Sequence, residues 1–158
     1  MTTLTIATPE EMNELGHRIA RELRAGDLVL LNGELGAGKT TLIRGIGEAL
    51  GVRGAVTSPT FVLARTHPRD GAPLVHVDAY RLGSAIELDD LDIDYAASIV
   101  VVEWGAGLLD GVAQSWLTVD IERPHGGEAE SEVEPRTVSI SGTGSRWADV
   151  EWHSAARD

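Results

Sequence analysis

The chain has 158 residues, of which 42% are hydrophobic and 24% charged, a composition typical of a single globular domain with a substantial core. It contains no cysteine, no apolar stretch of about 18 residues and no signal-peptide pattern, which excludes disulfides and thiolate metal sites and predicts a cytoplasmic protein without a membrane anchor. Its net charge of −12, from 13 basic and 25 acidic residues, disfavours direct binding of tRNA or DNA, because neutralising phosphates requires Lys and Arg.

Helix and strand signals alternate along the chain. Thr8 as N-cap, Pro9 at the first helical position and Glu11 as the partner in a capping box predict the start of the first helix. Apolar residues then recur at three- and four-residue spacing, and we expect this helix to end at Gly26. A further helix is expected over 40–50, stopped by Gly51, and residues 87–97 are expected to form a helix or a helical turn. Strands are expected over 28–31, 60–66, 74–78, 98–103, 117–121 and 137–141.

The order of these elements predicts one α/β domain over residues 1–158, because apolar strands alternate with helices and nothing marks a second domain. The later run of strands indicates a mixed sheet. The segment 125–135 is rich in Gly and Glu and predicts a solvated, mobile acidic loop. Residues after 142 carry no motif and receive no functional assignment.

A phosphate-binding loop follows the first predicted buried strand. Residues 33–40 read G-E-L-G-A-G-K-T, which satisfies the pattern G-x-x-x-x-G-K-[ST] between a strand and a helix. Backbone N–H groups of such a loop surround phosphates, and the helix adds its positive N-terminal end. Lys39, the only lysine in the chain, is expected to neutralise the β- and γ-phosphates, the Thr40 hydroxyl to bind Mg²⁺, and Thr41 to touch the α-phosphate. The predicted nucleotide-binding residues are Gly33, Glu34, Leu35, Gly36, Ala37, Gly38, Lys39, Thr40 and Thr41.

This motif predicts a P-loop NTPase with a mixed, mostly parallel central sheet flanked by helices. ATP is favoured over GTP by elimination, because the guanine-reading Asn-Lys-x-Asp segment cannot exist in this chain. Its asparagines are Asn13 and Asn32, and its lysine lies in the phosphate loop.

Two acidic residues each follow an apolar strand and are candidates for the catalytic chemistry. Asp78 ends the run 74–77, and Glu103 ends the run 99–102. In open α/β folds ligands bind at the carboxyl ends of the strands, where one carboxylate would approach Mg²⁺ and another would position the attacking water. The alternative for either residue is an ordinary solvated strand end. His76 shares a strand face with Asp78 and could bind metal with it, although a His-x-Asp pair is more often structural.

Four segments together resemble one family. They are G-E-L-G-A-G-K-T-T at 33–41, T-S-P-T-F at 57–61, H-V-D-A-Y-R-L at 76–82 and V-E-W at 102–104. In order and spacing they are similar to the bacterial tRNA threonylcarbamoyladenosine biosynthesis ATPase family, TsaE, over about residues 8–121. The phosphate loop alone is generic, whereas the second and third segments at these distances are specific.

The resemblance implies an activity, partners and residue roles. The family assists in placing a threonylcarbamoyl group on adenosine 37 of tRNAs that read codons starting with A, acting through a heterodimeric transferase and reaching tRNA only indirectly. By resemblance, Thr40 and Glu103 hold Mg²⁺ beside ATP, and Asp78 acts either on the attacking water or on the groups that surround the metal ion. Thr60, in the segment 58–60, would sense the γ-phosphate. We therefore expect slow ATP hydrolysis, with Lys39, Asp78 and Glu103 as the catalytic residues.

Two other functions remain possible on the same scaffold. The first is a small-molecule kinase, although such enzymes usually carry an arginine-bearing lid late in the chain, where this sequence is acidic and Gly-rich. The second is a nucleotide-gated binding module with negligible hydrolysis. Single-turnover hydrolysis, measured with and without partners, distinguishes all three.

Overall fold

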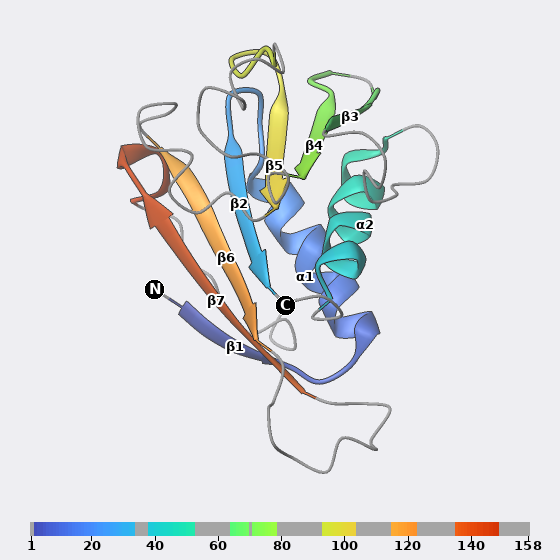
Figure 1. Cartoon of the computed structure of the whole chain (residues 1–158), viewed down its shortest axis with the longest axis vertical. Coiled ribbons are helices and arrows are strands. Elements are labelled where there is room, and N and C mark those ends of the chain that lie inside the picture. Colours follow the sequence, from blue (N-terminus) through green and yellow to red (C-terminus); the bar gives the residue numbers. More distant parts are fainter. Residues whose placement is uncertain are drawn as a thin grey trace.

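The computed structural model describes residues 2–33, 38–52, 64–69, 71–78, 93–103, 115–122 and 135–148. Seven strands in this part of the chain form one sheet, and two helices pack beside it (Figure 1). In chain order the elements are β1 (Thr2–Ile6), α1 (Pro9–Glu22), β2 (Leu28–Gly33), α2 (Lys39–Leu50), β3 (Ala64–His67), β4 (Leu74–Asp78), β5 (Ile99–Glu103), β6 (Trp116–Glu122), β7 (Arg136–Thr143) and the 3₁₀ turn η2 (Ser145–Trp147).

The sheet is parallel in its centre and antiparallel at both sides. Its strand order is β1-β7-β6-β2-β5-β4-β3. Strand β2 pairs in parallel with both β5 and β6, and β4 pairs in parallel with β5. The three outer strands β1, β7 and β3 each pair antiparallel with their neighbours. This arrangement confirms the predicted mixed α/β sheet with a parallel core.

Helix α1 begins as predicted but ends earlier. Thr8 Oγ1 accepts a hydrogen bond from the Glu11 backbone N–H at 3.1 Å, which caps the first turn. The helix ends at Glu22, so the predicted end at Gly26 was wrong. Gly26 instead has a φ of 95° within the turn that leads into β2. This turn is closed by the Asp27 carboxylate, which accepts the Arg24 N–H at 2.8 Å and competes with helix continuation.

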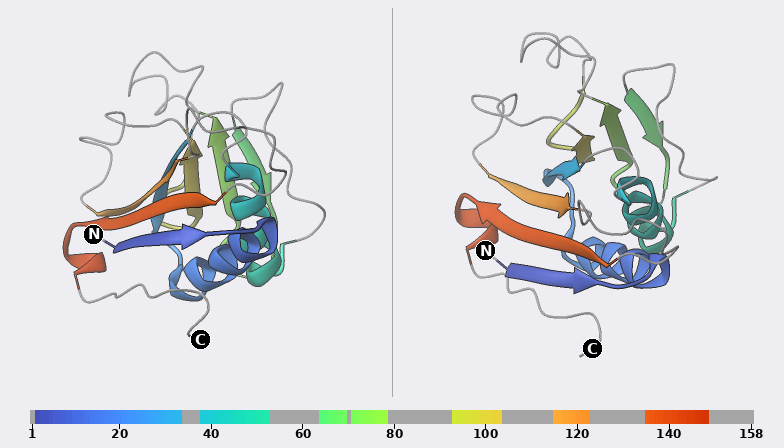
Figure 2. Two further views of the ribbon diagram at one scale, coloured as in Figure 1. Left: turned by 90° about the horizontal axis from the view of Figure 1, so that it is seen from below. Right: turned by 60° about the horizontal axis from the view of Figure 1, so that its bottom comes forward.

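The two helices lie side by side against one face of the sheet (Figures 1 and 2). Glycines permit their close approach. A Cβ atom at Gly16 would lie 2.4 Å from the Leu42 backbone oxygen, and one at Gly45 would lie 2.3 Å from the Asn13 backbone oxygen. No side chain fits at either position without moving a helix. The position of α2 relative to the sheet therefore depends on contact between two helix backbones.

Alternating strand residues divide the core into two clusters. The larger cluster includes the apolar side of α1 and α2 together with Val29, Leu31 and Val101 on the helix side of the sheet. The smaller cluster lies on the opposite face, and its buried members are Leu28, Leu30, Val75, Val77, Val100 and Val102. Because both faces of β2 and β5 are buried, these strands read as continuous apolar runs in the sequence.

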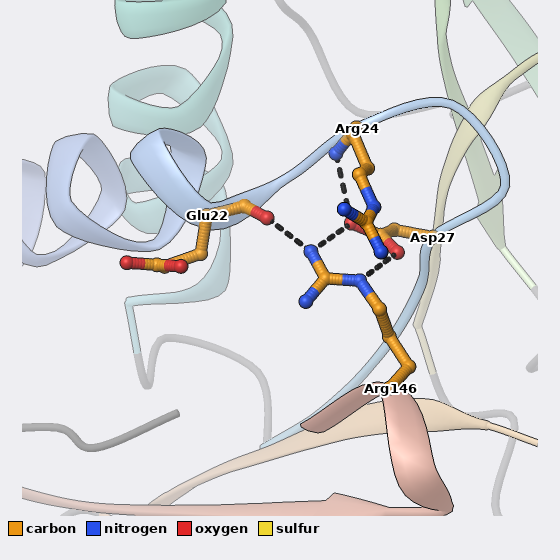
Figure 3. Close-up of polar contacts among 4 residues, drawn as sticks. All are labelled: Glu22, Arg24, Asp27 and Arg146. Carbon is orange, nitrogen blue, oxygen red and sulfur yellow. Dashed lines mark hydrogen bonds and ion pairs between the residues drawn. The ribbon is translucent and has the colours of Figure 1, made fainter. Parts of the chain in front are cut away.

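The C-terminal part of the described chain packs onto the core through Arg146 and Trp147. The Arg146 guanidinium binds both oxygens of Asp27, with N–O distances of 2.9 Å, and donates to the Glu22 backbone oxygen (Figure 3). It also lies 4.2 Å from the centre of the Trp147 ring. Trp147 is buried against the larger cluster, as expected for a packing residue. Residues 142–148 are thus an integral part of the domain.

Several expected elements differ from the structure or lie outside its described residues. Strand β1 was not predicted, although Leu4 and Ile6 alternate with threonines and are buried as an amphipathic strand requires. Of the helix or helical turn expected over 87–97, residues 95–97 form a turn, and residues 87–92 lie outside the described residues. Residues 60–63, part of an expected strand, and 123–134, which include most of the expected acidic loop, lie outside the described residues. Neither described helix has the length and hydropathy that a membrane span requires.

Candidate functional site

The predicted strand–loop–helix arrangement is present around the phosphate-loop motif. Strand β2 ends at Gly33, and α2 begins at Lys39 with Gly38 as its N-cap. Gly38 has a φ of 115°, a conformation that side-chain-bearing residues rarely adopt. Residues 34–37, and with them the predicted ligands Glu34, Leu35, Gly36 and Ala37, lie outside the described part of the chain.

The first turn of α2 is suited to an anion. It contains no acidic residue, and Gly38 supplies no side-chain cap, so no side chain of the N-cap residue covers the first N–H groups. Lys39, the first residue of the helix, is 8% exposed, and its ammonium donates to the Gly33 backbone oxygen. A buried cation therefore lies between the end of β2 and the positive end of α2. Thr40 and Thr41 follow in the same turn, and both are half-buried.

Glu103 ends β5 directly beside this cation. Its register partner on β2 is Leu31, so its carboxylate lies near the end of β2 that leads into the phosphate-loop motif. The residue is only 7% exposed. Glu103 Oε1 lies 4.0 Å from the Lys39 ammonium, and Oε2 lies 2.6 Å from Nε2 of His76. The two oxygens of one buried carboxylate therefore face two different partners.

Asp78 occupies the neighbouring strand end. It is the last residue of β4, and it pairs in register with Glu103. Both acidic strand ends are thus at the same edge of the sheet, as their positions in the sequence predicted. Its side chain lies outside the described part of the structure, as do the whole of Thr60 and the rest of the 57–61 segment.

His76 was the residue that sequence reasoning undervalued. It was read as more often structural than functional, and its partner was sought in Asp78 on the same strand. The structure pairs its Nε2 with Glu103 on the next strand, so this nitrogen is not directed to a metal shared with Asp78. The available signal was a single polar residue within the apolar run 74–77, which is unusual for a strand buried on both faces.

A second buried histidine, His67, lies on β3 next to β4. Burial lowers the pKa of the His67 imidazole, and the neighbouring basic groups of His76 and Arg65 lower that pKa further. Its Nε2 atom has no hydrogen-bond partner among the described residues. His67 is therefore a neutral neighbour of the site.

The oxygen donors present fit Mg²⁺ better than a transition metal. The Glu103 carboxylate and the Thr40 hydroxyl supply hard oxygen atoms, which Mg²⁺ prefers. Within the described ranges no group of three or more His, Asp or Glu side chains forms a metal cage.

Comparisons with known proteins agree on a single family. The family model described as Threonylcarbamoyl adenosine biosynthesis protein TsaE matches residues 6–132. The tRNA threonylcarbamoyladenosine biosynthesis protein TsaE of Streptomyces coelicolor is 57% identical over 145 residues, which cover 89% of this chain and 96% of the relative. Proteins of the same name from Mycobacterium bovis and Bacillus subtilis are 51% and 34% identical, covering 77% and 79% of this chain and 79% and 78% of the relatives.

A solved structure extends the likeness to the fold. The crystal structure of Bacillus subtilis YdiB is similar with a TM-score of 0.64 and 29% identity, over 91% of this chain and 86% of that one. The family match includes Gly33, Lys39, His76 and Glu103, which form the site described above. The chain therefore belongs to the family of threonylcarbamoyl adenosine biosynthesis proteins, TsaE.

Proposed function

We propose that this chain is a Mg²⁺-dependent ATPase that assists threonylcarbamoylation of adenosine 37 in tRNAs reading codons that start with A. Membership of the TsaE family supports the pathway. One observation carries the ATPase assignment: the buried Lys39 ammonium at the N-terminus of α2 lies 4.0 Å from the buried carboxylate of Glu103. This is the pairing of a phosphate-binding cation with a metal-binding anion that ATP and Mg²⁺ require.

Each residue then has a distinct role in hydrolysis. The Lys39 ammonium and the first N–H groups of α2 bind the phosphates. The Thr40 hydroxyl and the Glu103 carboxylate hold Mg²⁺, which when bound neutralises charge on the phosphate oxygens. Asp78 orients the water that adds to the γ-phosphorus as the bond to the bridging oxygen of ADP breaks. Thr60 senses the γ-phosphate.

The phosphate role of Lys39 is tested by calorimetric titration with ATP and Mg²⁺. Lys39→Ala removes a charge-assisted hydrogen bond, so we expect affinity to fall by about ten- to a hundredfold or more. Arg44→Ala is the matched control, because Arg44 is an exposed cation on the same helix and its loss changes the net charge equally. Wild-type affinity in Lys39→Ala, or an equal loss in Arg44→Ala, would contradict the assignment.

The roles of the two acidic strand ends are tested by separating binding from turnover. Glu103→Gln and Asp78→Asn should lower kcat more than ATP affinity, because metal and water placement act mainly in the transition state. Phosphate release at saturating ATP measures the first quantity, and calorimetry measures the second. Wild-type turnover in both variants would remove both residues from the mechanism.

The partner is proposed to be the heterodimeric threonylcarbamoyl transferase of the same pathway. A chain with a net charge of −12 is poorly suited to hold tRNA by itself, so its action on tRNA passes through other proteins. We expect slow phosphate release alone and faster release when the purified heterodimer is added. Tight tRNA binding by the isolated chain in a gel shift at physiological salt would contradict this proposal, as would the absence of stimulation. Phosphate transfer to a small molecule would favour the kinase alternative.

A further inference from the structure

The side chain of His76 is placed where it can control Glu103. It lies on β4, opposite Val101 in the parallel register, and therefore one step diagonally before Glu103 on the same face of the sheet. Its Nε2 lies 2.6 Å from Glu103 Oε2, and the residue is 1% exposed. Both members of this hydrogen bond are therefore buried.

The chemistry of the pair decides which atom carries the proton. An ionised carboxylate can only accept hydrogen bonds, so His76 Nε2 is the donor. A hydrogen bond to a charged acceptor in a buried position is stronger than one between neutral groups. It holds Oε2 in place and leaves Oε1 on the side of Lys39, at 4.0 Å from its ammonium.

A purely structural role explains this residue poorly. Strands β4 and β5 are already joined through five consecutive register pairs, so a side-chain link between them adds little. The other ring nitrogen of His76, Nδ1, is buried and has no partner among the described residues. Burying an unpaired polar atom costs stability, and an apolar residue of similar size would avoid that cost. The presence of His76 is therefore better explained by its hydrogen bond to Glu103, which fixes the position of that carboxylate.

We propose that His76 is a positioning residue that holds the Glu103 carboxylate so that a single oxygen, Oε1, is presented to the metal ion. This inference rests on the proposed function, because it assigns a task to a neighbour of the proposed Mg²⁺ ligand. Groups that orient a metal ligand typically affect metal affinity or activity by about ten- to a hundredfold when they are removed. His76 therefore sets Mg²⁺ affinity and turnover without touching the nucleotide.

The test compares two substitutions of His76 with one substitution of another buried histidine, which serves as the control. His76→Leu removes the donor and keeps the approximate volume, whereas the amide nitrogen of His76→Gln reaches close to the position of Nε2. His67→Leu is the control, since His67 is also buried on the helix side of the sheet but lies on β3, which β4 separates from the strand of Glu103. Thermal unfolding by circular dichroism verifies that each variant is folded.

The main measurement is the Mg²⁺ concentration that gives half-maximal binding of a non-hydrolysable ATP analogue, determined by calorimetry. A second titration, in excess chelator, gives the affinity for the same analogue without Mg²⁺. We expect His76→Leu to raise the Mg²⁺ requirement by about ten- to a hundredfold with unchanged affinity in chelator. His76→Gln should recover most of this loss, and His67→Leu should match the wild type. With the hydrolysable nucleotide, kcat of His76→Leu should fall more than KM rises.

Three results would overturn the proposal. They are an unchanged Mg²⁺ requirement in His76→Leu, an equal increase in His67→Leu, or a loss in His76→Gln as large as in His76→Leu. If His76→Leu does not fold, the Mg²⁺ requirements of His76→Gln and His76→Asn are compared instead. The Asn side chain is too short to reach Oε2 of Glu103, so His76→Asn should have the larger Mg²⁺ requirement, and equal requirements would overturn the proposal. Failure of the proposed function is recognised separately, since the wild-type chain itself would then show no Mg²⁺-dependent nucleotide binding.

Discussion

Replacing Gly45 with alanine should push apart the two helices that position the site. A Cβ atom at this position would lie 2.3 Å from the backbone oxygen of Asn13 and 3.1 Å from its Cα. Non-bonded heavy atoms in favourable contact are about 3.5 Å or more apart, so α1 and α2 must separate by roughly 1 Å. The obstructing atoms belong to backbone, and no change of rotamer can relieve the overlap.

The expected free energy is the difference between two opposing effects. Forcing an extra carbon into a well-packed contact costs about 1–3 kcal/mol, and an overlap with helix backbone belongs at the upper end. Alanine is favoured over glycine in a helix interior by about 1 kcal/mol. We therefore expect Gly45→Ala to lower the free energy of unfolding by about 2 kcal/mol, which corresponds to roughly 4–8 °C in Tm for a chain of this size.

Urea unfolding, with Tm as a second measurement, checks this prediction. Exposed Arg44 provides the control, because the difference between Arg44→Ala and Arg44→Gly measures the alanine preference of the same helix without the contact. The reasoning is refuted if Gly45→Ala stabilises the protein by about that difference. Such a result would show that the helices yield without cost at this crossing.

The remaining predictions concern the C-terminal contact and a buried titrating group. Arg146→Ala should lower the free energy of unfolding by about 1–3 kcal/mol, because it leaves the buried Asp27 carboxylate without its cation. A double-mutant cycle with Asp27→Asn, measured by urea unfolding, should give a coupling energy of similar size. The pKa of His67 is lowered in the folded state by burial, so the associated stability is complete above its ordinary value of 6.5 and is lost as the pH falls through the folded-state pKa. The free energy of unfolding should therefore fall less between pH ~7.5 and ~5.5 in His67→Leu than in the wild type, and an equal fall in both would contradict the assignment.

Local signals in the sequence predicted most of the helices and strands, and they predicted the phosphate-loop helix and the acidic strand ends of the candidate site. The cap at Thr8, the strand 74–78 and the helix that follows the glycine-rich loop are encoded by residues close together in the chain, and all three are confirmed. The end of α1 was misplaced because Gly26 looked like a helix stop, whereas the turn closed by Asp27 ends the helix earlier. Strand β1 was overlooked because only two of its five residues are apolar.

The pairing of His76 with Glu103 could not be read from the sequence. It depends on β4 lying next to β5 in a particular register, and periodicity carries no information on which strands become neighbours. The contact between Arg146 and Asp27 depends likewise on where the C-terminal turn packs. Tertiary juxtaposition of charged residues was therefore the part that composition and spacing left undetermined.

The pairing of the first strand with the last has a consequence for synthesis on the ribosome. Among the described strands β1 is translated first, yet within that part of the chain it pairs only with β7, with Thr2 opposite Ile140. The parallel strands at the centre of the sheet are all translated in between, so β1 must wait for them before it can pair with β7. Strand β7 leads into the turn that contains Arg146, whose guanidinium binds Asp27 in the turn before β2. Docking of β7 late in folding therefore both pairs β1 and fixes that turn. A nascent chain stalled before residue 136 is therefore expected to leave β1 accessible to proteases and chaperones until translation resumes.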